Sequence, residues 1–160
     1  MLEHTPSRPV TLSHASSDED SEHQHEQEVV LVVDDDSGIA NFVDEFLTDE
    51  GFAVTLLRDR HVEGVRAAIE RLRPDCVLLD GDVRGNYGAS WGHAAWMTAL
   101  RPPVPVIMFS TDQQATTEAT THESERSQAA GFSSVILKPF NLEDLLQLVI
   151  KAVAHSPVRA

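Results

Sequence analysis

The sequence has little of several features that would point to other classes of protein. Only one of its 160 residues is a cysteine, Cys76, so no disulfide can form within the chain, as is usual in a reducing cytosol. No apolar run is long enough to span a bilayer, and the N-terminus lacks the basic-then-apolar order of a secretion signal. We therefore expect a soluble, cytoplasmic protein that has no membrane partner.

Positive charge is also scarce. Twelve Lys and Arg residues stand against 26 Asp and Glu residues, which gives a formal net charge of −14. Proteins that bind the phosphate backbone of nucleic acids rely on clustered Lys and Arg, so this balance argues against direct DNA binding. The acidity is better explained by solubility or by attraction to a basic partner surface.

Large apolar side chains are almost missing from residues 1–27, which are rich in Ser, His, Glu, Asp and Gln. Such a segment cannot bury enough surface to offset the entropy of ordering, so we predict a disordered acidic extension. His23 and His25, flanked by Glu22 and Glu26, could bind a transition metal weakly, although a solvated polar tail is the plainer interpretation. At the other end, residues 155–160 are predicted to form a short tail.

Between these ends, residues 28–154 alternate apolar runs with helical patterns. The runs predict strands near 29–33, 52–57, 76–80, 106–109 and 134–137, and the periodicity predicts helices near 39–47, 62–72, 89–100 and 142–153. Continuous apolar runs are typical of strands buried on both faces, as in parallel sheets. The pattern therefore predicts a doubly wound α/β domain with a five-stranded parallel sheet, in three layers α/β/α.

Two segments of this domain stand out. Residues 112–130 are rich in Thr, Glu and Ser and have only alanines as apolar anchors, so we expect weak helicity at best and high mobility there. The last helix has a broad apolar face. Its apolar residues are Leu142, Leu145, Leu146, Val149, Ile150 and Val153. Core packing explains most of this face, but part of it could support a homodimer.

Chemically useful residues follow four of the predicted strands. Asp34 and Asp35 follow the first, Asp80 ends the third, Ser110 follows the fourth and Lys138 follows the fifth. In an open α/β sheet the ligand site lies beyond the carboxyl ends of the strands, so these side chains should meet at one edge.

Such a set of residues favours phosphoryl transfer to a carboxylate. Two carboxylates about 4 Å apart repel by roughly 4 kcal/mol at an effective dielectric near 20, so the cluster needs protons or a hard cation, for which Mg²⁺ is best suited. Lys138 and Ser110 could stabilise a transferring phosphoryl group while Asp80 acts as nucleophile and forms an acyl phosphate. Each residue also has a plainer explanation as a loop, capping or surface residue. Their shared position at strand ends argues against that explanation.

From about residue 28 to 154 the chain resembles the receiver domain of two-component response regulators. The matching segments are Val32-Val33-Asp34-Asp35-Asp36, Leu78-Leu79-Asp80, Pro105 to Ser110, and Gly131 followed by Lys138-Pro139-Phe140. The resemblance implies that Asp80 is the phosphoacceptor for a histidine kinase or phosphotransfer protein. It also implies that the protein is no dedicated enzyme but catalyses its own phosphorylation and dephosphorylation at Asp80. It also implies that Ser110 and Lys138 contact the phosphoryl group and that the Lys138–Pro139 bond is cis.

The same resemblance implies a magnesium site. Asp34, Asp35 and Asp80 would hold Mg²⁺, with Asp34 acting through water, and the backbone carbonyl of Asp82 would be a further ligand. Asp82 and Thr111 flank the entry and are expected to influence the access of water.

Three departures from the family pattern concern signalling. Val135 stands three residues before Lys138, where the family usually has Tyr or Phe, and Arg84 stands where a proline is common. The segment between Ser110 and Gly131 is longer and more polar than usual. We expect signal transmission to differ, whereas phosphoryl transfer should be retained.

Two alternative functions remain open. Asp80-Gly81-Asp82-Val83 resembles the Asp-x-Asp motif of haloacid-dehalogenase-like phosphatases, but that family has its metal-binding acid pair after the lysine. Here the acids after the lysine, Glu143 and Asp144, are predicted to lie in a helix. A phosphorylation-independent interaction module on the same fold is the other alternative. No output domain is expected after residue 154, so the predicted output is the binding of a downstream protein target.

Overall fold

The computed structural model describes residues 27–58, 61–81 and 87–156. The predicted N-terminal extension with its histidines, the loop residues Asp82 and Arg84, and the end of the predicted tail lie outside these described residues. Within them, no helix has the length and apolar character needed to cross a membrane.

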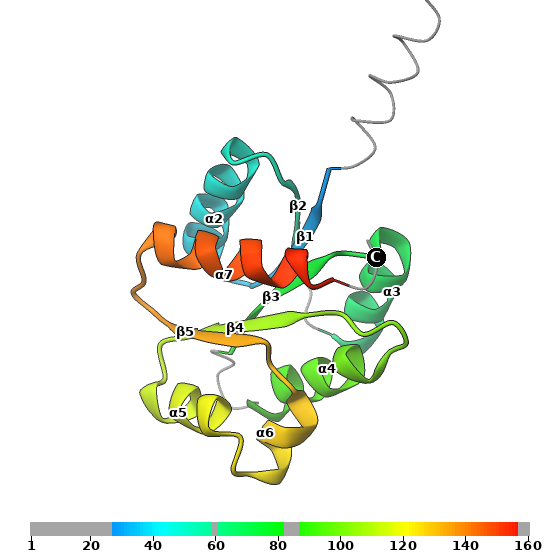
Figure 1. The fold of residues 1–160 in the computed structure, drawn as a ribbon, viewed down its shortest axis with the longest axis vertical. Coiled ribbons are helices and arrows are strands. Elements are labelled where there is room, and N and C mark those ends of the chain that lie inside the picture. Colours follow the sequence, from blue (N-terminus) through cyan, green and yellow to red (C-terminus); the bar gives the residue numbers. More distant parts are fainter. Residues whose placement is uncertain (1–26, 59–60, 82–86, 157–160) are drawn as a thin grey trace, which may run out of the picture.

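Five parallel strands form a single sheet in the order β2-β1-β3-β4-β5, as Figure 1 shows. They are β1 (Val29–Val33), β2 (Ala53–Leu57), β3 (Cys76–Asp80), β4 (Val106–Ser110) and β5 (Ser134–Leu137). The helices are α2 (Ser37–Asp49), α3 (Val62–Leu72), α4 (Tyr87–Ala99), α5 (Gln113–Thr121), α6 (Glu125–Ala130) and α7 (Leu142–Ala154). The structure confirms the predicted fold class, and most of the predicted element boundaries agree to within two residues.

Helices cover both faces of the sheet, with α2 and α7 on one face and α4, α5 and α6 on the other (Figure 1). The central strands contribute to two hydrophobic clusters, because successive side chains of a strand point to opposite faces. In β3, for example, Val77 and Leu79 pack with α3 and α4, whereas Cys76 and Leu78 pack with α2 and α7. This double burial explains the continuous apolar runs of the central strands, and Cys76, the first residue of β3, is fully buried in the core.

The expectation of weak helicity for residues 112–130 is wrong, because this segment forms two helices, α5 and α6. Polar side chains at the helix starts stabilise the two helices, although the segment has few apolar residues to bury. Asp112 caps α5 by accepting from the amide of Ala115 at 3.0 Å, and Ser124 caps α6 by accepting from the amide of Ser127 at 3.2 Å. Such N-caps satisfy amides that a helix end would otherwise leave without partners.

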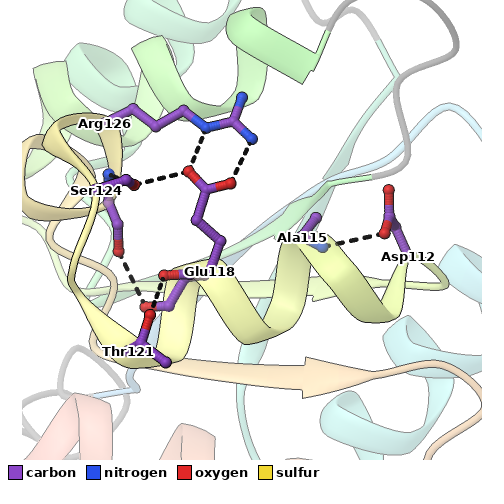
Figure 2. A network of polar contacts seen from close by, with 8 residues as sticks. Asp112, Ala115, Glu118, Thr121, Ser124 and Arg126 are labelled. Atoms are coloured by element: carbon purple, nitrogen blue, oxygen red, sulfur yellow. Dashed lines mark hydrogen bonds and ion pairs between the residues drawn. The ribbon is translucent and has the colours of Figure 1, made fainter.

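A polar network then joins the two helices (Figure 2). Arg126 in α6 donates to both carboxylate oxygens of Glu118 in α5, at 2.6 and 2.8 Å, and Ser124 Oγ donates to Glu118 at 2.7 Å. The Arg126 guanidinium also lies 4.4 Å from the centre of the Trp91 ring in α4. Charge-assisted, bidentate pairs are stronger than neutral hydrogen bonds, so the network helps to order this polar segment against α4. The high mobility expected for residues 112–130 stays a prediction.

The broad apolar face of α7 is used mostly for the core. Leu145, Leu146, Val149 and Val153 are buried, and Ile150 is 43% exposed. A homodimer through this helix therefore stays a prediction. In α2, the side chain of Phe42 is 68% exposed although the residue is apolar.

Candidate functional site

The strand ends bring three of the predicted acids together. Asp34 and Asp35 directly follow β1, and Asp80 is the last residue of the neighbouring strand β3. One carboxylate oxygen from each of the three lies within 4.8 Å of the other two. Asp34 and Asp80 are buried, whereas Asp35 is exposed, so the cluster reaches the surface on one side.

Lys138 reaches the same cluster from the end of β5. Its Nζ donates to Asp80 Oδ1 at 3.0 Å, and both side chains are buried. The backbone amide of Lys138 donates to the carbonyl of Ser110 at 2.8 Å, which fixes the end of β5 beside the end of β4. The Lys138–Pro139 bond is cis, as predicted. The buried ion pair therefore joins two strand ends that are separated by β4 in the sheet.

Asp34 carries the strongest electrostatic signature of the cluster. Burial raises the pKa of Asp34 from its ordinary value of 3.8 to about 7 and is the largest cause, while the hydrogen bond from the Asp36 amide lowers it and the neighbouring Asp80 raises it. Asp34 Oδ1 accepts from Asp36 N at 2.8 Å. Asp34 Oδ2 is buried and has no hydrogen-bond partner among the described residues.

These features fit a hard divalent cation. A buried carboxylate oxygen without a donor, close to two further carboxylates, is a ligand set that suits Mg²⁺. A cation there would also offset the mutual repulsion of the acids, in addition to the ion pair of Lys138 with Asp80 and the effect of its charge on Asp34. Asp34, Asp35 and Asp80 could therefore hold the metal. The predicted carbonyl ligand of Asp82 lies outside the described residues.

Ser110 ends β4 and is fully buried next to these groups. Its Oγ accepts a hydrogen bond from the amide of Asp112 at 3.0 Å, which links the hydroxyl to the residue that caps α5. Thr111 follows Ser110 and is exposed, at the position predicted to flank the site. Ser110 therefore joins the strand end to the helices that follow it.

Two further residues support the site and were not predicted from the sequence. Ser90 in α4 donates its hydroxyl to the backbone carbonyl of Asp80 at 2.8 Å. A side chain at Gly81 would bring its Cβ within 3.0 Å of Met108 Sδ and 3.2 Å of Ser110 Cβ. The glycine directly after the strand-end acid was a visible signal for a close approach, whereas no spacing pattern connects Ser90 with Asp80.

The acids that follow the lysine do not join this cluster. Glu143 and Asp144 lie in the first turn of α7, as predicted, where carboxylates interact favourably with the helix dipole. Over the part of the chain that the structure describes, Asp34, Asp35 and Asp80 form the one group of three or more potential metal ligands. The arrangement therefore differs from the acid pair expected for the phosphatase alternative.

Comparison with known proteins gives a consistent result. A family model described as the response regulator receiver domain matches residues 30–150. The chain is 30% identical over 122 residues to the DNA-binding response regulator MtrA of Mycobacterium tuberculosis, covering 75% of this chain and 48% of that protein. It is 28% identical over 120 residues to the probable transcriptional regulator ycf29 of Cyanophora paradoxa, covering 75% and 53%. The chain thus spans about half the length of these curated relatives.

Solved structures show the same similarity. A response regulator from Thermotoga maritima is 25% identical with a TM-score of 0.64, covering 80% of this chain and 98% of that one. The receiver domain of NtrX from Brucella abortus is 26% identical with a TM-score of 0.64, covering 79% and 99%.

Proposed function

This chain belongs to the response regulator receiver domain family of two-component signalling, and from that premise we propose that Asp80 accepts a phosphoryl group from a histidine kinase or a phosphotransfer protein. One observation carries the proposal. The Asp80 carboxylate lies buried between the Lys138 ammonium, 3.0 Å away, and the carboxylates of Asp34 and Asp35. A carboxylate in this environment can act as a nucleophile beside groups that bind a cation and a phosphoryl group.

In the proposed reaction an Asp80 carboxylate oxygen attacks the phosphorus of a phosphohistidine. The new O–P bond forms as the N–P bond breaks, and the leaving imidazole takes up a proton. Lys138 then pairs with the phosphoryl oxygens. The Ser110 hydroxyl, which accepts a hydrogen bond from the amide of Asp112 before phosphorylation, would donate its own proton to an oxygen of the phosphoryl group. Both groups act from fixed backbone positions, which lowers the cost of reorganisation during the reaction.

Magnesium is the proposed cofactor, and Asp34, Asp35 and Asp80 are its proposed side-chain ligands, with the carbonyl of Asp82 as a further ligand. When bound, Mg²⁺ would neutralise negative charge on the carboxylates and the incoming phosphoryl group. The unpartnered Asp34 Oδ2 supports this assignment. Hydrolysis of the acyl phosphate would return Asp80 to its carboxylate, with Asp82 and Thr111 influencing the access of water.

The proposed output is binding of a downstream protein rather than direct binding of DNA. Phosphorylation would shift an existing equilibrium of the surface formed by α5, β5 and α7. The hydrogen bond between Asp112 N and Ser110 Oγ supports this route, because it connects the site directly to the start of α5. The relatives named as DNA-binding response regulators are about twice as long as the matched region, so their DNA binding is not transferred to this chain.

Intact mass spectrometry after incubation with acetyl phosphate and Mg²⁺ tests the proposed chemistry. The wild type should gain one phosphoryl group, and this gain should disappear with EDTA and in Asp80→Asn. Asp144→Asn, which removes an exposed carboxylate from the first turn of α7, is the matched control and should still be labelled. Unchanged labelling of Asp80→Asn would refute Asp80 as the acceptor.

A phosphorylation-independent interaction module is the second candidate. Val135 stands at the position where the family usually has an aromatic residue, and it packs, partly buried, against the hydrophobic cluster of α3 and α4. Because valine has no aromatic ring, no ring at this position can change its orientation on phosphorylation. This candidate requires the wild type to stay unlabelled and Asp80→Asn to bind its partner as well as the wild type does.

A further inference from the structure

A groove lies between α3 and α4 on the sheet face opposite to α7. It has a volume of about 420 Å³ and is lined by apolar side chains together with two arginines and one acid, Glu70. The residues that matter here are Ile69, Arg73, Pro74, Trp96, Leu100 and Arg101. Arg73 and Pro74 follow the end of α3, and Leu100 and Arg101 follow the end of α4. Both helices run back toward the start of the parallel strands, so the groove opens at the sheet edge opposite to Asp80.

Positive charge gathers around this groove in an otherwise acidic protein. Four of the eight Lys and Arg residues that the structure describes belong to α3 or to the residues just after α3 and α4. They are Arg66, Arg71, Arg73 and Arg101, and all four are exposed. The acids of α3 are Glu63 and Glu70, so the local balance is positive.

The arginines also have an orientation that suits carboxylates. The Arg66 guanidinium lies 4.9 Å from the centre of the Trp96 ring, which holds one charge over the groove wall. Arg101 Nη1 donates to the carbonyl of Leu100 at 2.8 Å, and this contact fixes a second guanidinium at the end of α4. Guanidinium groups present several donors in a rigid plane and pair well with carboxylates.

The sequence of this chain contains an acidic segment that ends three residues before Val29, a described residue near the groove. Residues 18–26 read Asp-Glu-Asp-Ser-Glu-His-Gln-His-Glu, with five carboxylates and no Lys or Arg. Val29, three residues after this segment, exchanges two hydrogen bonds with Asp75, from Val29 N to Asp75 Oδ2 and from Asp75 N to Val29 O, both 2.8 Å long. Asp75 follows Pro74, a residue of the groove wall. An extended chain advances about 3.3 Å per residue, so the segment is long enough to lie along the groove.

We propose that the acidic segment 18–26 docks in the groove between α3 and α4 of its own chain, with its carboxylates on Arg66, Arg73 and Arg101. Exposed ion pairs are individually weak. Tethering offsets this weakness, because a short linker gives the segment a local concentration on the order of millimolar at the groove. A second copy is the less favoured donor of the segment, since two molecules with a net charge of −14 repel each other. The contact is separate from the chemistry at Asp80.

A spin label on the segment tests this proposal in the full-length chain. Ser21→Cys provides a thiol for a nitroxide, whereas Cys76 is fully buried and burial raises its pKa strongly, so labelling should be restricted to residue 21. The amide NMR signals of Ile69, Arg73, Trp96 and Leu100 should lose intensity with the oxidised label and regain it after reduction. The signals of Thr117 and Thr121, on the exposed side of α5, should keep their intensity.

Charge variants give the decisive comparison. Arg66→Gln with Arg73→Gln should abolish the selective loss, whereas Arg58→Gln with Lys151→Gln, which removes two exposed charges elsewhere, should leave it unchanged. The loss should also disappear at about 1 M salt, where the screening length is only about 3 Å. Equal broadening over the groove and α5 would overturn the proposal. So would broadening that persists in Arg66→Gln with Arg73→Gln, or that reaches full strength in a mixture of labelled unenriched chains with unlabelled ¹⁵N-enriched chains.

Discussion

Lys138 Nζ lies 3.0 Å from Asp80 Oδ1, and this contact joins residues 58 positions apart in the sequence. Both side chains are almost fully buried, at 7% and 2% exposure. The ammonium also lies 4.5 Å from the centre of the Phe109 ring, which packs from β4. A buried pair of this kind gains little over an apolar core, but removing one partner leaves the other charge without compensation.

Replacement of Lys138 by Met should therefore destabilise the metal-free protein by about 3–5 kcal/mol, because the acids at the strand ends would lose their nearest cation. Urea unfolding measures the difference. Lys151→Met, which removes an exposed charge from α7, is the matched control and should change stability by less than about 0.5 kcal/mol. Equal stabilities for both variants would show that Lys138 does not compensate the acid cluster.

The raised pKa of Asp34 predicts a pH dependence with a definite sign. The pKa is about 7 in the folded chain and 3.8 ordinarily, so folding favours the protonated form. The contribution of Asp34 to stability is complete below about pH 4 and is lost as the pH rises toward 7. The metal-free variant Asp34→Asn should therefore become more stable than the wild type over this range, by about 1–3 kcal/mol at pH 8.

Magnesium should reverse this difference, since a cation removes the cost of the charged carboxylate. Thermal unfolding at pH 8 and pH 5, with Mg²⁺ and with EDTA, measures both effects. We expect Mg²⁺ to stabilise the wild type at pH 8, to do so much less at pH 5, and to leave Asp34→Asn almost unchanged. Equal stabilisation of Asp34→Asn would exclude Asp34 from the metal site.

The Glu118–Arg126 pair should contribute to stability over most of the pH range. Arg126 and then Ser124 lower the pKa of Glu118 to about 2 from its ordinary 4.5, so the contribution is present above about pH 4.5 and is lost as the pH falls toward 2. Glu118→Gln should cost about 0.5–1 kcal/mol at pH 7 and progressively less below pH 4.5. Chemical denaturation across this range measures it. Glu45→Gln, an exposed substitution within α2, should show no such trend.

A side chain at Gly81 should be accommodated poorly, because its Cβ would lie 3.0 Å from Met108 Sδ and 3.2 Å from Ser110 Cβ. Gly81→Ala should destabilise the fold by about 1–3 kcal/mol and slow labelling by acetyl phosphate, since the side chains of Met108 and Ser110 must move to make room. The control is Gly92→Ala within α4, where a Cβ meets nothing within 4 Å and alanine should stabilise the helix by up to about 1 kcal/mol. Labelling of Gly81→Ala at the wild-type rate would contradict this prediction.

The sheet and the position of its chemistry could be predicted because both depend on local pattern. The apolar runs before Asp34 and Asp80 are buried on both faces, whereas the run before Lys138 forms a partly buried strand at the end of the sheet. The parallel arrangement brings the ends of all three runs to one edge. In any sequence that predicts a parallel sheet, polar residues directly after the strands can be expected to lie together at one sheet edge. The proximity of the three acids follows from strand order, without any knowledge of side-chain geometry.

The helices α5 and α6 escaped prediction for a physical reason. Their stability comes from the caps Asp112 and Ser124 and from the pair between Glu118 and Arg126, which are contacts of polar residues. Hydrophobic periodicity does not report such contacts. The hydrogen bond from Ser90 to the Asp80 carbonyl was missed in the same way, because it depends on how α4 packs onto the sheet.

The two tryptophans of this protein both lie in α4, each with a guanidinium over its ring: Trp91 with Arg126 and Trp96 with Arg66. All indole emission of the molecule therefore originates from one helix. Trp91 follows Ser90, whose hydroxyl donates to the Asp80 carbonyl, so Trp91 reports on the sheet edge that carries Asp80. Trp96 lines the groove between α3 and α4 and reports on the opposite edge. Exchanging either indole for phenylalanine leaves a single tryptophan, whose emission can be excited selectively and provides an optical readout of one edge without any attached dye.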